Sequence, residues 1–166
     1  MQDRLAVAFT GPSNSGKTTL IVNLSSYLQD KGYKVAIVKH DPKDKAVFDK
    51  EGKDSFKFSQ TGADVAVVSP KKTTYLKGET STIDELVNIF GDFDFLLVEG
   101  LKTLPLPRVC VCREKINNNY FDVSDILAID DSINKEDIPT DMNLLDLNNY
   151  EQIANWIKKK WEKGIK

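Results

Sequence analysis

The segment that most constrains this chain is Gly11-Pro12-Ser13-Asn14-Ser15-Gly16-Lys17-Thr18, which has the spacing G-x-x-x-x-G-K-S/T. An apolar run at residues 5–10 precedes it and an amphipathic run at residues 17–31 follows it, as a buried strand and a helix would. The glycines let the backbone turn its N–H groups inward around phosphate oxygens, and the helix N-terminus adds unpaired donors and positive charge. A plain Gly/Ser turn is the alternative, but strand, loop and helix together favour a phosphate-binding loop.

The residue types in this loop predict a nucleotide and a metal as ligands. Lys17 is expected to reach the β- and γ-phosphates of a nucleoside triphosphate, and the Thr18 hydroxyl is expected to ligate Mg²⁺. The predicted nucleotide contacts are Gly11, Pro12, Ser13, Asn14, Ser15, Gly16, Lys17, Thr18 and Thr19. The loop alone does not name the base, the reaction or the partner.

Composition narrows the class of protein. The chain has 166 residues and a net charge of −2, so we predict one nucleotide-binding domain over residues 1–166 and no nucleic-acid partner. No apolar run is long enough to span a bilayer, and a core strand begins within five residues of the N-terminus. We therefore expect a cytoplasmic protein that does not bind a membrane.

The rest of the chain alternates apolar and amphipathic runs. Strands are predicted at residues 33–38, 65–69, 73–77, 94–100, 109–112, 126–129 and 143–147. Helices are predicted from Asp54, after Thr82 as part of a capping box with Glu85, and after Asn148 with Glu151. This pattern predicts an α/β fold of the three-layer P-loop type, with a mostly parallel sheet, helices on both faces and an inserted β-hairpin at residues 65–77.

A metal-binding acid is expected at the end of a neighbouring strand. Glu99 follows the apolar run Phe95-Leu96-Leu97-Val98, so we predict that it holds Mg²⁺ together with Thr18. A solvated acid at a turn is the alternative. Asp94 stands at the start of the same strand and is therefore expected at the opposite edge of the sheet.

The base has two candidate readers. Asn134-Lys135-Glu136-Asp137 matches the N-K-x-D pattern with which many GTPases bind guanine, but four residues separate it from the preceding strand. Asp130 follows the strand directly and is better placed to accept hydrogen bonds from guanine. We predict Asp130 as the base contact and keep Asp137 as the alternative.

The cysteines Cys110 and Cys112 lie two apart on one predicted strand. Their side chains would share a face and could contact one metal ion, but the chain has no second cysteine pair and one histidine. We therefore predict two buried, reduced thiols.

Four segments in order resemble the molybdopterin-guanine dinucleotide biosynthesis adaptor protein B (MobB) family: the phosphate loop through Leu20, Val38-Lys39-His40, Gly52-Lys53-Asp54-Ser55 and Val98-Glu99-Gly100-Leu101-Lys102. The resemblance covers essentially the whole chain. It implies a homodimeric protein that binds GTP and Mg²⁺, has at most weak GTPase activity, and assists the nucleotidyltransferase that joins GMP to molybdopterin. It also implies dimer contacts through the hairpin at residues 65–77, and places His40 and Asp54 at the edge of the site.

Two other classes of P-loop protein are alternatives. A small-metabolite kinase or synthetase that uses ATP would place arginines in a lid over the phosphates, and none of Arg4, Arg108 and Arg113 lies in the candidate lid at residues 41–53. A partitioning or targeting ATPase would carry a lysine where Pro12 stands. With no arginine finger within the loops and no glutamine beside Glu99, any GTPase activity is expected to be slow.

Overall fold

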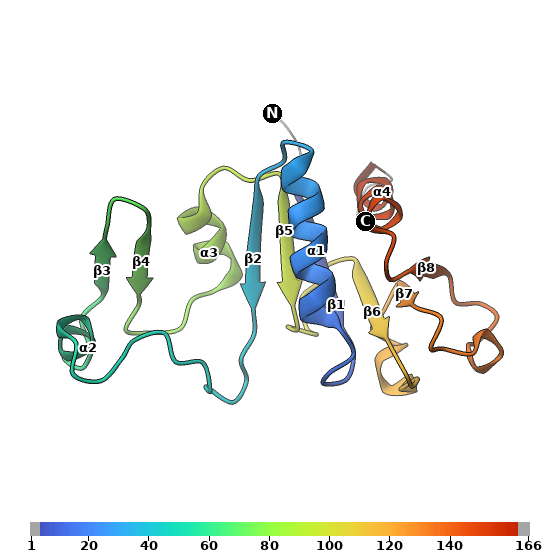
Figure 1. Ribbon diagram of the computed structural model, residues 1–166, viewed down its shortest axis with the longest axis horizontal. Helices are drawn as coiled ribbons and strands as arrows, with labels where there is room; N and C mark the ends of the chain where they lie inside the picture. Colours follow the sequence, from blue (N-terminus) through green and yellow to red (C-terminus); the bar gives the residue numbers. More distant parts are fainter. Residues whose placement is uncertain (1–3, 163–166) are drawn as a thin grey trace. The chain divides into compact units, whose positions relative to one another are not determined.

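The computed structural model describes residues 4–162. They form two compact units, one of residues 4–40 and 92–162 and the other of residues 41–91 (Figure 1). Within the described range no helix has the length and apolar character that crossing a bilayer requires.

The first unit contains a six-stranded sheet in the order β2-β5-β1-β6-β7-β8. Every neighbouring pair in it is parallel. The carboxyl ends of the strands therefore meet at one edge, where ligands bind in folds of this kind. The strands are β1 (Leu5–Thr10), β2 (Val35–Lys39), β5 (Phe95–Glu99), β6 (Arg108–Cys112), β7 (Ile126–Ile129) and β8 (Leu144–Asp146), which confirms the predicted strands of this sheet within one or two residues.

The two faces of the sheet are covered differently. Helices α1 (Lys17–Asp30) and α4 (Tyr150–Glu162) pack on one face, where Leu24 and Ile153 are buried in a single core with Phe95. On the other face Cys110 and Leu127 lie in a smaller core with residues of the segments that carry the 3₁₀ turns η1 (Asn118–Tyr120) and η2 (Lys135–Asp137). The predicted α/β fold with a mostly parallel sheet is confirmed, although the 3₁₀ turns were not predicted.

The ends of α1 and α4 show which local signals were reliable. Gly32 follows α1 with φ of 86° and donates to the Gln29 carbonyl, as a helix-ending glycine does. The predicted start of α4 was wrong by one residue. Asn149, rather than Asn148, accepts from the Gln152 N–H at 2.9 Å, because the Asn148 N–H is turned back toward the Asp146 carboxylate.

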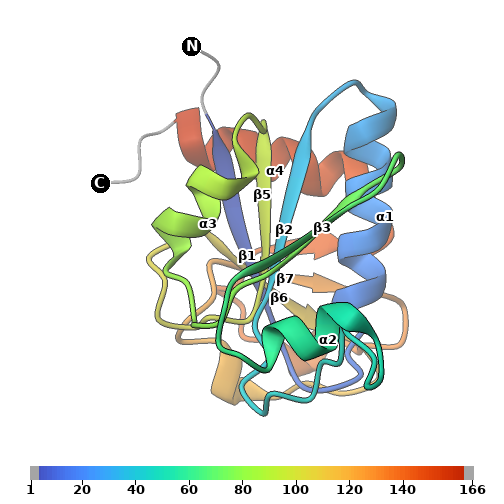
Figure 2. The same cartoon turned by 90° about the vertical axis from the view of Figure 1, so that its left-hand side faces the viewer.

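The second unit contains the predicted hairpin. Strands β3 (Val65–Val68) and β4 (Thr73–Leu76) pair antiparallel and form a narrow two-stranded ribbon, with α2 (Asp54–Ser59) beside the start of β3 (Figure 2). The third helix, α3 (Ile83–Phe90), begins with the predicted capping box: Thr82 and Glu85 exchange side-chain-to-backbone hydrogen bonds of 2.8 and 3.3 Å.

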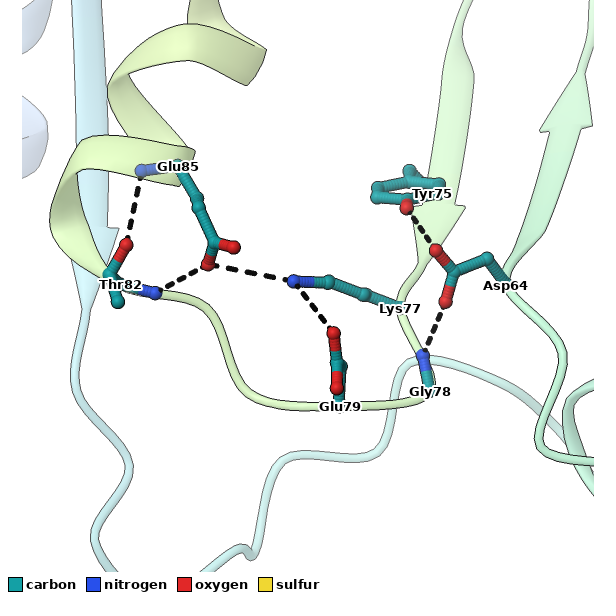
Figure 3. A network of polar contacts seen from close by, with 7 residues as sticks. All are labelled: Asp64, Tyr75, Lys77, Gly78, Glu79, Thr82 and Glu85. Atoms are coloured by element: carbon teal, nitrogen blue, oxygen red, sulfur yellow. Dashed lines mark hydrogen bonds and ion pairs between the residues drawn. The ribbon is translucent and has the colours of Figure 1, made fainter.

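Polar contacts hold the base of the ribbon (Figure 3). Asp64 accepts from the Tyr75 hydroxyl at 2.5 Å and from the Gly78 N–H at 2.9 Å. These bonds lower the pKa of Asp64 and raise that of Tyr75. Lys77 lies 3.5 Å from both Glu79 and Glu85, so it links the end of β4 to the first turn of α3.

Candidate functional site

The loop between β1 and α1 has a backbone that only particular residues adopt. Gly11 has φ of 136°, and a Cβ placed there would lie 2.5 Å from the Val111 carbonyl oxygen. Gly16 has φ of 91°, in the left-handed region. Asn14 also has a positive φ, 64°, which asparagine tolerates better than most residues. The sequence signal at these positions therefore reflects a real constraint on the backbone.

This conformation leaves hydrogen-bond donors unused at the start of α1. Within the described residues, the N–H groups of Gly16, Lys17, Thr18 and Thr19 donate no hydrogen bond, and no side chain caps the helix. The Ser15 hydroxyl is buried and likewise has no partner there. Unpaired donors at a helix N-terminus are suited to phosphate oxygens. The loop thus fits the phosphates of a nucleotide.

Lys17 brings a charge to the same place. Its Nζ donates to the carbonyls of Pro12 at 2.6 Å and Gly11 at 3.1 Å, so the ammonium group lies over the loop. Burial lowers the pKa of Lys17, and the nearby carboxylate of Glu99 opposes that effect. A lysine in this position neutralises phosphate charge.

Glu99 lies beside the loop, at the end of β5. The Thr18 hydroxyl donates to Glu99 Oε2 at 3.3 Å, and Lys39 Nζ lies 3.5 Å from the same oxygen. The Glu99 side chain is only 15% exposed. A hydroxyl and a carboxylate at this separation supply the hard oxygen ligands that Mg²⁺ prefers, with water and phosphate oxygens completing its shell. Asp94 lies at the opposite edge, as predicted, where it accepts from the Lys34 N–H.

A cavity of about 500 Å³ opens over these groups. Its lining includes the predicted Lys17, Thr18 and Glu99, and also Arg113, which follows β6. The sequence alone assigned no role to Arg113. The signal available in the sequence was that Arg113 stands directly after an apolar strand. The remaining lining residues are Ser13, Asn14, Gly16, Thr19 and Lys39.

The two candidate base readers lie in different surroundings. Asp130 lines a second cavity, of about 710 Å³, together with Asn134 and Lys135; Asp137 is absent from the lining that the structure describes. Asn134 caps the turn η2 by accepting from the Glu136 N–H, so the N-K-x-D segment forms a 3₁₀ turn. The position of Asp130 at the strand end thus makes it the better placed of the two.

The Asp130 carboxylate is held on both oxygens. Oδ2 accepts from Arg113 Nε at 2.7 Å, and Oδ1 accepts from the Ser132 hydroxyl at 2.5 Å and from its N–H at 3.1 Å. Burial acts to raise the pKa of Asp130, but the bonds from Ser132 and Arg113 outweigh it and hold the pKa below its usual range. Asp130 is therefore an oriented carboxylate.

A buried arginine holds the loop that follows Glu99. The Arg108 side chain is 2% exposed, and its terminal nitrogens donate to the carbonyls of Gly100, Leu101 and Leu104 at 3.0 to 3.1 Å. Leu101 has φ of 47°, which costs free energy for a residue with a side chain. Arg108 thus stabilises a strained turn next to Glu99, a role that sequence reasoning missed.

The remaining predicted residues lie outside the cavities at Lys17 and Asp130. His40 is exposed, and its N–H donates to the Glu99 carbonyl at 3.0 Å. Cys110 and Cys112 are fully buried free thiols with their sulfurs 3.7 Å apart, as predicted. The contact with Cys112, together with burial, raises the pKa of Cys110. No group of three or more His, Cys, Asp or Glu side chains suited to a metal ion occurs in residues 4–162.

The parallel sheet, the glycine-bounded loop and the Thr18–Glu99 pair define the P-loop nucleotide-binding fold class. A model of the family described as molybdopterin guanine dinucleotide synthesis protein B matches residues 6–131, and the chain belongs to this MobB family. It is similar to the molybdopterin-guanine dinucleotide biosynthesis adapter protein of Haemophilus influenzae, with 31% identity over 92% of this chain and 86% of the relative. The Escherichia coli adapter protein is 30% identical over 91% and 90% of the two chains. A crystal structure of molybdopterin-guanine biosynthesis protein B aligns with a TM-score of 0.69 and 26% identity, covering 94% of this chain and 98% of the other.

Proposed function

We propose that this chain is a GTP-binding adaptor in the biosynthesis of the molybdopterin guanine dinucleotide cofactor. The observation that carries the nucleotide part is the loop itself: unpaired N–H groups at the start of α1, with Lys17 above them and the Thr18–Glu99 pair beside them. Membership in the MobB family, whose relatives are named adapter proteins, supports the adaptor role. The protein acts in the cytoplasm, with GTP and Mg²⁺ as its ligands.

Mg²⁺ would be held by the Thr18 hydroxyl and by Glu99, directly or through water. It would neutralise charge on the β- and γ-phosphates. Lys17 and the unpaired N–H groups of Gly16 to Thr19 bind the phosphate oxygens. The single arginine in the cavity lies on the side away from Glu99, so little in the site favours rapid transfer of the γ-phosphate. Hydrolysis by the protein alone is therefore slow at most, and binding is its main task.

The direct test is calorimetric titration of the protein with GTP and with ATP, each with and without Mg²⁺. We expect tighter binding of GTP, strengthened by the metal. A clear preference for ATP would contradict the guanine assignment. Co-purification with the nucleotidyltransferase that joins GMP to molybdopterin tests the adaptor role, and failure to associate in the presence of GTP would remove it.

Asp130 is proposed as the guanine reader because it is oriented and lines the larger cavity. Guanine offers a ring N–H and an amine to a carboxylate, whereas xanthine presents a carbonyl where guanine has the amine. We expect Asp130→Asn to lower GTP affinity by about tenfold or more and to improve binding of xanthosine triphosphate, because an amide can donate to that carbonyl. Affinities for both nucleotides measure this change.

Asp137→Asn is the matched control, since it makes the same change in the exposed turn η2. It should leave both affinities unchanged. If Asp137→Asn switches the preference instead, the N-K-x-D segment reads the base and the assignment to Asp130 is wrong. Improved binding of xanthosine triphosphate cannot arise from damage to the fold, so the readout is specific.

The hairpin is proposed as the contact of a homodimer. Val67, Val68 and Tyr75 are 44%, 77% and 46% exposed. A lone two-stranded ribbon is marginally stable in water, and its free edges are ready to pair with another strand. Val68 and Tyr75 share one face of the ribbon and Val67 lies on the other, so a second copy packed on the first face would cover Val68 and Tyr75.

We expect Val68→Lys to convert the dimer to a monomer, because the substitution places a charge in the interface. Val22→Lys makes the same change at a 55% exposed valine of α1 and should leave the dimer intact. Analytical ultracentrifugation over a range of protein concentrations measures the effect. A Val68→Lys protein that sediments like the unchanged dimer would place the interface elsewhere.

A further inference from the structure

Arg113 is a charged side chain that lines the cavity at Lys17. Neither the phosphate-loop motif nor the Thr18–Glu99 pair gives it a role. It is the first residue after β6 and is 35% exposed. Its guanidinium reaches the loop: a Cβ placed on Gly16 would lie 3.7 Å from Arg113 Cζ and Nη1. The Arg113 guanidinium therefore lies close to the start of α1, where the unpaired N–H groups are.

The order of strands separates Arg113 from the metal-binding acid. β1 carries the loop and lies between β5 and β6. Glu99 ends β5, so the Thr18–Glu99 pair flanks the loop on one side, and Arg113 flanks it on the other. The second side leads toward β7, where Asp130 lines the larger cavity. Arg113 thus stands between the phosphate loop and the proposed base cavity.

Asp130 fixes the orientation of this arginine. Arg113 Nε donates to Asp130 Oδ2 at 2.7 Å, and Ser132 holds the other carboxylate oxygen. The two terminal nitrogens of Arg113 make no hydrogen bond to any residue in the range 4–162. A guanidinium anchored at Nε still presents its Nη1–Nη2 edge, which matches two oxygens of one phosphate.

We propose that Arg113 binds the α-phosphate of the nucleotide and that Asp130 is its positioning residue. The proposal rests on the proposed function, because it takes the loop as the nucleotide site. The Thr18–Glu99 pair would hold Mg²⁺ beside the β- and γ-phosphates, and the base would lie toward Asp130. The phosphate next to the ribose is therefore the one that passes Arg113. Ser132 also holds the Asp130 carboxylate, so the contact of Asp130 with the base does not depend on Arg113.

The test is calorimetric titration of Arg113→Ala and Arg113→Lys with GTP, GDP and inosine triphosphate. For Arg113→Ala we expect the Kd values of GTP and GDP to rise by the same factor, about tenfold or more, because both carry the α-phosphate. The ratio of GTP to inosine triphosphate affinity should stay unchanged. Arg113→Lys keeps the charge but lacks the paired Nη1 and Nη2 donors. Its Kd values for GTP and GDP should therefore lie between those of the unchanged protein and Arg113→Ala.

Other outcomes overturn the proposal. If Arg113→Ala weakens the binding of GTP but not of GDP, Arg113 contacts the γ-phosphate. If the ratio of GTP to inosine triphosphate affinity changes, Arg113 acts through the base. Lys115→Ala removes a nearby exposed charge outside the cavity and should change nothing. If Lys17→Ala abolishes binding while Arg113→Ala does not weaken it, only this inference fails. If the unchanged protein binds neither GTP nor GDP, the proposed function fails.

Discussion

Replacement of Lys17 by alanine is expected to lower the affinity for GTP by about a hundredfold, because in the proposed site the ammonium group would make charge-assisted hydrogen bonds to two phosphates. In the structure Lys17 Nζ lies over the loop, bonded to the carbonyls of Gly11 and Pro12. Alanine leaves the loop N–H groups in place. It removes Lys17, which is the only lysine of α1 and whose ammonium group lies over the loop. Isothermal titration with GTP and Mg²⁺ measures the loss.

A second readout for Lys17→Ala is thermal stability. A ligand that binds the folded state raises the melting temperature, so GTP should stabilise the unchanged protein and have little effect on the variant. Lys31→Ala removes an equal charge just beyond the other end of α1 and should keep the full response. Unchanged GTP affinity in Lys17→Ala would show that the loop is not the triphosphate site.

Replacement of Arg108 by leucine is expected to lower the free energy of unfolding by about 3 kcal/mol, because three carbonyl acceptors lose their donors. The three carbonyls, which now accept from the guanidinium, are partly buried. The turn at Leu101 would also lose the contact that stabilises its positive φ. Urea denaturation followed by circular dichroism gives the difference.

Arg4→Leu is the matched control for Arg108→Leu. The Arg4 side chain is 46% exposed, lies 3.9 Å from the Asp92 carboxylate and stands over the Phe93 ring at 4.9 Å, contacts expected to contribute about 2 kcal/mol or less together. Arg108→Lys should recover part of the loss, because one ammonium group cannot reach all three carbonyls. Equal destabilisation by Arg108→Leu and Arg4→Leu would show that the buried contacts contribute little.

Much of the fold could be predicted because its signals are local. The apolar runs of β5 and β7 are buried on both faces, so they appear in the sequence as continuous hydrophobic stretches. Thr82 and Glu85 stand three residues apart and cap α3 as that spacing predicts. The start of α4 was misplaced because two adjacent asparagines compete as caps, and the neighbouring Asp146 carboxylate decides between them.

The candidate site was predicted only where its residues are adjacent in the chain or end a strand. Glu99 could be proposed because it follows an apolar run, although 81 positions separate it from Thr18. Arg108 and Arg113 could not be assigned, because nothing near either of them in the sequence marks its partner. The hydrogen bond from Arg108 to the Gly100 carbonyl and the ion pair of Arg113 with Asp130 form only when β6 lies between β1 and β7.

The sequence by itself determined the phosphate loop, because that loop depends on backbone conformations that Gly11 and Gly16 impose on their immediate neighbours. It also determined which segments become strands and helices, because hydrophobic periodicity is a local property. Only the tertiary structure decided what surrounds the loop: Glu99 on one side, Arg113 on the other, and Asp130 beyond it. Strand order brings these residues together, and it is set by packing of the whole sheet rather than by any single segment.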